Sequence, residues 1–412
     1  MRTFAISTLG CKVNAVESDR YVHAMKQANM KQVDFKEKAD TYIINTCAVT
    51  NAAAAKSRQK IKQAIKNNPD AHIVVVGCSL TADSDNLAKI KEIDTMIYQD
   101  DKEHFDEIVL KRKLMSDLSH VNTAKTRAFL KIQDGCEQYC SFCVIPLARG
   151  KEKSVDIDQI VEHAKALVGA NHKEIVLTGI HIGKYKGDKG ESLLSLLKQL
   201  VTIEGLERIR ISSIEITELH DDLLQFMSVQ PKIAKHLHIP LQSANDEVLY
   251  NMNRPYTMDY FFKKINLIRQ LMPDVMISSD VIAGFVGETN DQFNQSKANI
   301  EALELGFLHV FPYSKRKNTV AATLDGHVEA SVIKQRTKEL LDVSNRLRKQ
   351  NLANYMLKEV TVLIESKNEK GYFGYSEHYI PVVVMDDECL VNELVKVQIT
   401  QIANNVCYGK LI

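Results

Sequence analysis

The first part of the chain repeats one hydrophobic pattern three times. The short apolar runs TFAISTLGC, TYIINTC and HIVVVGC end at Cys11, Cys47 and Cys78, and an amphipathic, helix-like run follows each of them. Apolar strands that alternate with helical patterns predict βαβ units in a parallel sheet. Because the carboxyl ends of parallel strands lie along one edge, where ligands bind, we expect these three cysteines, the edge trio, to lie together there.

The middle of the chain resumes this strand–helix alternation after a polar connector over residues 102–126. Six candidate strands follow, which are AFLKIQDG, EIVLTGIHIG, RIRISSIE, HLHIPLQ, VMISSDVIAGF and FLHVFPYS. Helical patterns such as DQIVEHAKALVG and YFFKKINLIRQLM separate them. Six βα units predict an incomplete parallel barrel, with its reactive residues at the carboxyl ends of the strands.

The last part of the chain changes character. A long basic helical pattern within residues 328–357 leaves the barrel, and EVTVLIES, YIPVVVM and LVKVQITQI then alternate apolar and polar positions. This predicts a small all-β barrel of a kind that often binds nucleic acid, in which Cys389 and Cys407 are buried packing residues. The fold class is therefore α/β with a terminal all-β module, divided into residues 1–115, 116–345 and 350–412.

The composition indicates the class of protein and its cellular location, but it does not indicate an activity. The 412 residues are 45% apolar and 25% charged, which excludes an intrinsically disordered chain. With 53 basic and 52 acidic residues the net charge is +1, so any nucleic-acid footprint must be local. The sequence lacks a secretory signal and a membrane span, and a cytoplasmic location is expected. In that reducing setting, clustered cysteines favour metal binding or catalysis over disulfides.

The sharpest chemical signal is GCEQYCSFC, which places Cys136, Cys140 and Cys143 on one loop after a predicted strand. Three thiolates in this loop trio can hold three irons of a [4Fe-4S] cluster and leave the fourth iron without a protein ligand, as a catalytic metal requires, and we predict such a cluster here. A zinc loop is the alternative, but no fourth Cys or His follows within the loop. An ordinary ferredoxin-type cluster is the other alternative.

The edge trio permits the same interpretation. Each of its cysteines alone is readily explained as a small buried residue. Three of them at the ends of successive parallel strands predict instead a second [4Fe-4S] cluster with one open iron.

Two resemblances connect these motifs. The loop trio, with Phe142 before its last cysteine, resembles the signature of the radical S-adenosylmethionine (SAM) enzymes, which implies that SAM binds the open iron and is cleaved to a 5′-deoxyadenosyl radical. The words TLGCKVNAVESD, NTCAVT and VVVGC resemble the amino-terminal domain of the methylthiotransferases, which continue into a radical SAM barrel and a small β-barrel called TRAM. The resemblance covers essentially the whole chain. It implies two [4Fe-4S] clusters, SAM, tRNA, and a reduced electron donor such as flavodoxin or ferredoxin, and it leaves the sulfur donor open.

One branch of that family is the best match. TLGCKVN, LKIQDGC, IVLTGIHIG and HIPLQS resemble the branch that adds a methylthio group to C2 of N6-threonylcarbamoyladenosine at position 37, next to the tRNA anticodon. Methylthiolation of isopentenyladenosine in tRNA, or of a ribosomal-protein aspartate, is the alternative. A non-enzymatic RNA-binding protein with structural metal is a third possibility.

Candidate SAM contacts come from the ends of the barrel strands and from the cluster loop. They are Phe142, Arg149, Thr178, Gly179, Glu215, Gln242, Ser243 and Asp280. Near them the chain departs from the usual family pattern at Ala244, Val286 and Ile216, which affects the loops around the cofactor and not the cysteines.

Candidate RNA contacts are less specific. Basic residues occur over Lys56–Lys66 and Lys334–Lys349, where they suit phosphate contacts or equally a solvated helix face. Tyr372, Phe373, Tyr375 and Tyr379 in the terminal module either stack on loop bases or fill the core of the small barrel.

Overall fold

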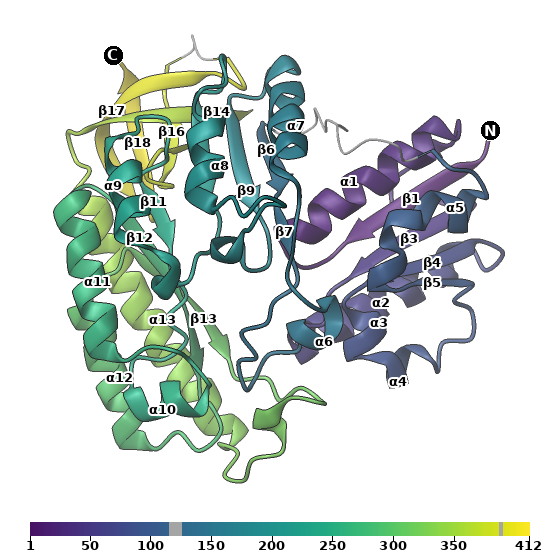
Figure 1. Cartoon of the computed structure of the whole chain (residues 1–412), viewed down its shortest axis with the longest axis horizontal. Coiled ribbons are helices and arrows are strands. Elements are labelled where there is room, and N and C mark those ends of the chain that lie inside the picture. The colour runs from purple at the N-terminus through teal and green to yellow at the C-terminus, as the bar shows by residue number, and fades with distance from the viewer. Residues whose placement is uncertain (115–125, 387–389) are drawn as a thin grey trace.

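The computed structural model describes residues 1–114, 126–386 and 390–412, which form three bodies (Figure 1). A parallel α/β sheet is followed by a barrel of strands and helices, and a small β-barrel closes the chain. The predicted fold class is confirmed.

The amino-terminal sheet is entirely parallel, with strand order β2-β1-β3-β4-β5. Its strands are β1 Thr3–Thr8, β2 Lys31–Gln32, β3 Thr41–Thr46, β4 His72–Gly77 and β5 Thr95–Ile97. Helix α1 (Lys12–Gln27) packs on Ile43 and Val74, and α2 (Asn51–Asn67) packs on Tyr42 and Ile44. Because alternate side chains point to opposite faces, the two helices cover the two sides, and the central strands are apolar throughout.

The chain after β4 differs from the single helix that its pattern predicts. Two short helices form instead, α3 (Ser79–Ala82) and α4 (Ser84–Leu87), and they are separated by Asp83 at φ −139°. The break leaves the carbonyl of Ala82 free to accept a hydrogen bond of 3.1 Å from Arg316 of the barrel. A contact between distant parts of the chain thus outweighs the local helical preference.

The predicted connector is also more ordered than expected in its first part. A 3₁₀ helix, η1 (Gln99–His104), and helix α5 (Phe105–Leu110) bury Lys102 and Phe105 against the sheet domain. Residues 115–125 of this connector lie outside the described residues.

All six predicted barrel strands are present, in two parallel sheets ordered β10-β9-β6 and β11-β12-β13. They are β6 Arg127–Lys131, β9 Glu174–Thr178, β10 Arg208–Ile211, β11 His236–His238, β12 Met276–Ala283 and β13 Phe307–Pro312. A parallel bridge between Ile209 and Ile233 joins the sheets. The longer helices beside them are α7 Ile157–Gly169, α8 Leu193–Leu200, α9 Asp221–Val229, α11 Met258–Leu271, α12 Asn290–Ala302 and α13 Ala330–Ala353.

The two faces of the barrel strands differ in chemistry. Outward positions such as Ile175, Ile209 and Leu237 belong to the apolar core shared with the helices. The alternate, inward positions include the apolar Phe129, Val176 and Phe307, and beside them polar or charged residues, which are Glu174, Arg208, Arg210, His236, His238, Asp280 and His309. Parallel barrels usually fill their interior with branched apolar side chains. This interior also carries charge and hydrogen-bonding groups.

The terminal module is a closed barrel with the order β14-β15-β16-β18-β17. Its strands are β14 Glu359–Asn368, β15 Gly371–Ser376, β16 Pro381–Val384, β17 Leu394–Ala403 and β18 Val406–Leu411. The sequence pattern predicted β14, β16 and β17 but missed β15 and β18. In β15, Gly374 is required because a Cβ there would lie 1.9 Å from the carbonyl oxygen of Leu363. Cys407 is buried as expected, and Cys389 lies outside the described residues.

Candidate functional site

The edge trio lies at one edge of the amino-terminal sheet. Cys47 directly follows β3, Cys78 directly follows β4, and Cys11 is the N-cap of α1, just beyond β1. These three strands are adjacent and parallel, so their ends lie side by side. Gly10, at φ +97°, makes the close approach possible, because a Cβ there would lie 2.9 Å from the sulfur of Cys47.

The thiols of the edge trio interact electrostatically. Burial raises the pKa of Cys47 and of Cys78, and charge on Cys11 raises each of them further, whereas Arg149 lowers both. Three sulfur donors without an oxygen ligand suit a soft metal centre, zinc or iron–sulfur, and the free side of Cys11 is accessible. The donor set therefore fits a cluster that uses three protein thiolates.

The loop trio lies between β7 (Gln133–Asp134) and α6 (Ile145–Arg149), at the carboxyl end of the barrel. N–H groups point at its sulfurs: Arg254 donates to Cys140 at 3.2 Å and the Ile145 amide donates to Cys143 at 3.4 Å. Burial raises the pKa of the Cys143 thiol to about 12. N–H donors to cysteine sulfur stabilise cluster ligands and tune their potential, so these contacts also fit an iron–sulfur cluster.

A buried histidine next to the loop trio was missed from the sequence. His181 Nδ1 lies 3.4 Å from the Cys136 sulfur and 3.0 Å from Glu152, and Nε2 pairs with Glu218. Burial opposes its protonation, but the bonds to Cys136 and Glu218 raise the pKa of His181 to about 10. The only available signal was its place in TGIHIG, after a predicted strand.

Arg254 was missed as well. It donates to Cys140 and also pairs with Glu215, the N-cap residue of the 3₁₀ helix η3 (Ile216–Glu218) after β10. One predicted SAM contact, Glu215, is thereby tied to the loop trio. The local sequence NMNRP does not indicate this role, because the residues that Arg254 contacts are distant in the chain.

The other predicted SAM contacts lie at the ends of the barrel strands. Thr178 is the last residue of β9, and at Gly179 a Cβ would lie 3.0 Å from the Gln133 carbonyl oxygen. Gln242 adopts a left-handed φ of 64° and pairs with β12 through its backbone. Ser243 next to it is buried, and its hydroxyl has no hydrogen-bond partner among the described residues.

The two remaining candidates of this group have protein partners. Asp280 on β12 pairs with His238 at 3.1 Å, and Phe142 packs edge-on against Phe285. Neither contact assigns a role toward SAM, so these residues stay predictions.

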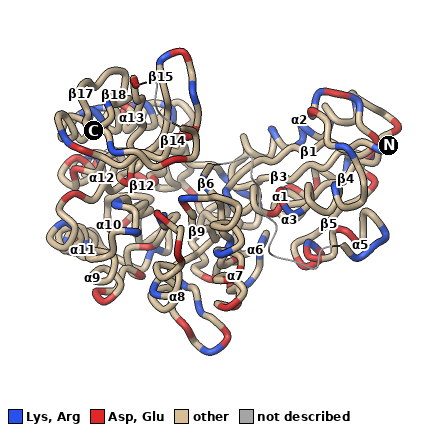
Figure 2. The backbone as a smooth tube through the Cα atoms, turned by 90° about the horizontal axis from the view of Figure 1, so that it is seen from above, with Lys and Arg blue, Asp and Glu red and all other residues tan. Residues whose placement is uncertain are grey.

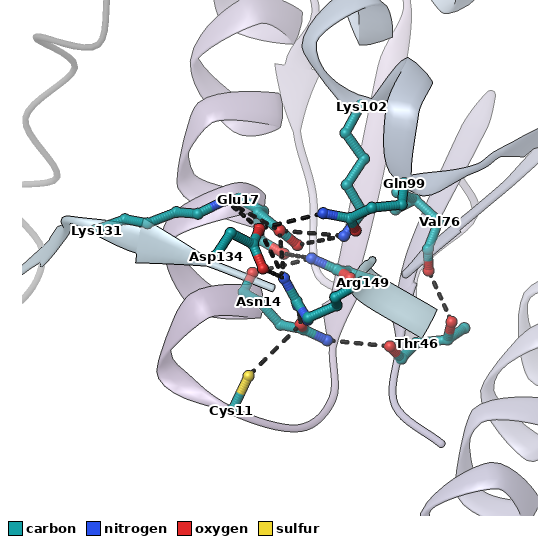
Figure 3. A network of polar contacts seen from close by, with 12 residues as sticks. Cys11, Asn14, Glu17, Thr46, Val76, Gln99, Lys102, Lys131, Asp134 and Arg149 are labelled. Carbon is teal, nitrogen blue, oxygen red and sulfur yellow. Dashed lines mark hydrogen bonds and ion pairs between the residues drawn. The ribbon is translucent and has the colours of Figure 1, made fainter. Parts of the chain in front are cut away.

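Arg149 differs from the other candidates because it points away from the barrel strands. Its guanidinium donates to Asp134 at 2.9 Å, to Glu17 at 3.1 Å and to Asn14, and its side chain is fully buried (Figure 3). Lys102 and Lys131 complete this network around Glu17. Its Nη atoms are bonded to protein acceptors at the boundary with the amino-terminal domain, and these contacts assign no role toward SAM, so the SAM contact stays a prediction.

A second set of contacts joins the same two domains. The loop after β13 meets the start of α2: the hydroxyl of Ser314 accepts a hydrogen bond of 2.9 Å from the Asn51 amide, and Arg316 bonds to the Asn51 side chain. Cys78 of the edge trio packs against Ala148 of α6, which begins two residues after Cys143. The two cysteine trios therefore lie on either side of this short helix.

Several of the candidate RNA contacts are engaged within the protein. Arg336 is buried against Glu288, Arg58 pairs with Asp83, and Tyr372 lies in the core of the terminal barrel. Tyr375 and Tyr379 stack on each other at 4.9 Å and lie beside arginines of the main barrel. Figure 2 shows Lys and Arg interspersed with Asp and Glu along the described residues.

Comparisons with known proteins agree with this architecture. The family described as uncharacterized protein family UPF0004 matches residues 3–98, and the radical SAM superfamily matches residues 130–298. Among solved structures, the radical SAM methyltransferase TsrM from Kitasatospora setae has a TM-score of 0.58 at 12% identity, covering 78% of this chain and 77% of its own. At that identity the likeness concerns the fold. No described helix is both long and apolar enough to cross a membrane.

Relatives of curated function cover nearly the whole chain. The threonylcarbamoyladenosine tRNA methylthiotransferase MtaB of Bacillus subtilis is 38% identical, over 97% of this chain and 94% of the relative, and that of Aquifex aeolicus is 34% identical over 92% and 95%. The tRNA-2-methylthio-N(6)-dimethylallyladenosine synthase of Thermodesulfovibrio yellowstonii is 31% identical over 100% and 99%. With these identities over the full length, and with the cysteine loop at the mouth of its barrel, the chain belongs to the radical SAM methylthiotransferase family of enzymes.

Proposed function

We propose that this enzyme adds a methylthio group to C2 of N6-threonylcarbamoyladenosine at position 37 of tRNA. The observation that carries the proposal is the full-length similarity to relatives named for that substrate, at 38% and 34% identity. The edge trio supports it, because a methylthiotransferase needs a second centre that carries sulfur. A reduced flavodoxin or ferredoxin is the expected electron source, and the terminal barrel is the expected TRAM module that engages tRNA.

The loop trio would hold the [4Fe-4S] cluster of the radical SAM reaction, and the edge trio would hold a second one. When bound, the first supplies the electron that cleaves SAM and the second carries the sulfur to be transferred. The chain's own residues orient these groups: Arg254 and the Ile145 amide donate to the loop sulfurs. Thr178, Gly179, Glu215, Gln242 and Ser243 surround the strand ends where SAM is expected.

The cations around the start of α1 favour a substrate with an anionic substituent. Lys12 directly follows Cys11 at the start of α1, and it has no ion-pair partner among the described residues. Burial lowers the pKa of its ammonium, and the charges of Arg127 and Arg210 lower it further. The threonylcarbamoyl group carries a carboxylate that would relieve this repulsion, whereas the dimethylallyl group is neutral and would not.

Nucleoside analysis tests the proposed substrate directly. The chain is expressed in a bacterial strain without methylthiotransferases, and digested tRNA is examined by mass spectrometry. We expect 2-methylthio-threonylcarbamoyladenosine, and no product from the Cys140→Ala control. A 2-methylthio-dimethylallyladenosine peak instead would establish the second candidate, which the 31% identical relative favours.

The role of Lys12 is tested in vitro on the same substrates. Lys12→Met is expected to weaken use of tRNA carrying threonylcarbamoyladenosine roughly tenfold or more, as expected for a lost hydrogen bond to a charged group. Reductive cleavage of SAM without tRNA serves as the control and should be unchanged. An unaltered KM for the tRNA would contradict carboxylate recognition by Lys12.

A further inference from the structure

A line of contacts connects the first cysteine of one trio to the first cysteine of the other, and Figure 3 shows the part of it from Cys11 to Asp134. The Cys11 thiol lies 3.7 Å from Asn14 Oδ1, and the same oxygen accepts a hydrogen bond from Arg149. Arg149 donates in turn to Asp134 Oδ1 at 2.9 Å, which accepts the Gly135 amide at 2.8 Å. Gly135 directly precedes Cys136. The Arg149 guanidinium therefore joins the two cysteine sites: Asn14 links it to the edge trio, and Asp134 links it to the loop trio.

The ends of this line are held rigidly. Asn14 donates to the carbonyl of Leu9 at 2.8 Å and to that of Thr46 at 3.0 Å, so it fixes the turns that carry Cys11 and Cys47. On the barrel side, Gly135 has a φ of +74°, and a Cβ there would lie 1.9 Å from the carbonyl oxygen of Lys151. Arg149 thus contacts two backbone segments that have little freedom of their own.

The same arginine ends the helix that separates the sites. Helix α6 begins at Ile145, whose amide donates to Cys143, and Ala148 packs against Cys78. At about 1.5 Å per residue, α6 rises by about 6 Å from Ile145 to Arg149. The length of α6 and the hydrogen bonds of Arg149 at its end together set the distance between the two trios.

We propose that Arg149 is a positioning residue that holds the edge trio at a fixed place relative to the loop trio, so that the sulfur delivered at one site meets the carbon activated at the other. This inference rests on the proposed two-centre function. Arginine suits the task because its planar fork bonds to Asn14 and Asp134 at once, whereas a lysine ammonium on a flexible stem reaches one acceptor well. A misplacement of about 1 Å between reacting groups can cost roughly 10²-fold in rate.

The test compares Arg149→Lys with a matched control, Arg336→Lys. Arg336 is likewise buried, donates to Glu288 at 2.8 Å and to Asn290 at 2.8 Å, but joins elements within the barrel region alone. The reconstituted enzyme with tRNA and reductant is assayed for methylthio product and for 5′-deoxyadenosine. We expect Arg149→Lys to keep both clusters and SAM cleavage while product per 5′-deoxyadenosine falls roughly tenfold or more. Arg336→Lys should keep the wild-type ratio.

A second readout uses the protein without clusters. Hydrogen exchange followed by mass spectrometry should show faster exchange in residues 12–27 and 145–149 of Arg149→Lys, with no such change in Arg336→Lys. An unchanged product ratio, an equal fall in both variants, or loss of iron from Arg149→Lys would overturn the positioning role. If the wild type modifies neither adenosine, the proposed function fails, and the exchange data still decide whether Arg149 docks the two domains.

Discussion

Two boundaries between domains use the same chemical unit, a buried carboxylate among guanidinium and ammonium groups. At the first boundary Glu17 of α1 meets Arg149 and Lys102. At the second, Glu174 of β9 accepts from Arg210 at 2.8 Å and from Arg208 at 3.1 Å, beneath the terminal barrel. Burial opposes ionisation of both acids, but their basic neighbours keep the pKa of each below its usual value.

The two boundaries differ in what the arginines contact beyond the acid. Arg149 bonds to side chains that adjoin cysteines, whereas Arg208 donates to the main-chain carbonyl of Thr361 at 2.7 Å and Arg210 to that of Ser376 at 3.0 Å. Every residue has a main-chain carbonyl that can accept such a hydrogen bond, so these contacts do not depend on particular side chains. The second boundary therefore attaches the terminal barrel as a module. The first boundary aligns specific side chains, and therefore geometry on which the reaction depends. Similar burial thus serves attachment in one place and alignment in the other.

The largest effect on stability is expected from Glu174→Gln, at the second boundary. It leaves Arg208 and Arg210 without their buried counter-charge, which typically costs about 3–5 kcal/mol. At roughly 2–4 °C per kcal/mol for a domain of this size, Tm should fall by about 10 °C in a thermal scan. SAM cleavage at low temperature should persist, because the loop trio is not involved. Loss of cleavage in a protein that is still folded would show that this boundary also aligns the site.

A smaller cost is expected from Asn14→Ala, at the first boundary. The change removes the acceptor of Arg149 and two bonds to strand-end carbonyls, a loss of about 1–3 kcal/mol for the unsatisfied groups. Product formation should fall more than stability does, in contrast to Glu174→Gln. Iron content and nucleoside product measured on the same preparation separate the two, and a proportional fall in Tm and product would remove the distinction between the boundaries.

The sequence predicted the strands and the cysteine edge because those features are local or follow from topology. Alternation of residue types marks each βα unit, and the parallel order brings Cys11, Cys47 and Cys78 to one edge. The boundary networks were not predictable: Asn14 and Arg149 are 135 positions apart, and neither segment has a pattern that indicates their contact. Strands β15 and β18 were missed because each contains a glycine where a neighbouring strand approaches closely.

A pH-dependent effect of intermediate size is expected at the second boundary from His236. Burial lowers its pKa well below the usual value, and so do the charges of Arg210, His238, Lys12 and His309 around it; the rings of Tyr379 and Phe307 lie beside it. The folded protein keeps this imidazole neutral, while the unfolded chain binds a proton below about pH 6.5. Stability should therefore fall by about 1.4 kcal/mol per pH unit on acidification from pH 6.5.

Denaturant unfolding at pH 7.5, 6.5 and 5.5 measures this slope. His236→Gln retains a partner for the Ser278 hydroxyl, which lies 2.9 Å from the imidazole, but cannot titrate. It should lose the part of the slope below pH 6.5. Equal slopes in the two proteins would show that His236 does not govern the acid sensitivity of the second boundary.

The smallest effect is expected from Arg127→Lys, at the rim of the second boundary. The Arg127 guanidinium lies 4.9 Å from the ring centre of Tyr375 and 5.4 Å from that of Tyr379, and it pairs with Glu365. Lysine keeps the charge toward Glu365 but loses the planar stacking, worth about 0.5–1 kcal/mol, so Tm should fall by only about 1–4 °C. Because this contact attaches the terminal barrel without touching either cysteine trio, product per 5′-deoxyadenosine should not change while tRNA binding weakens. A change in that ratio without weaker binding would mean that the second boundary, too, aligns the reacting groups.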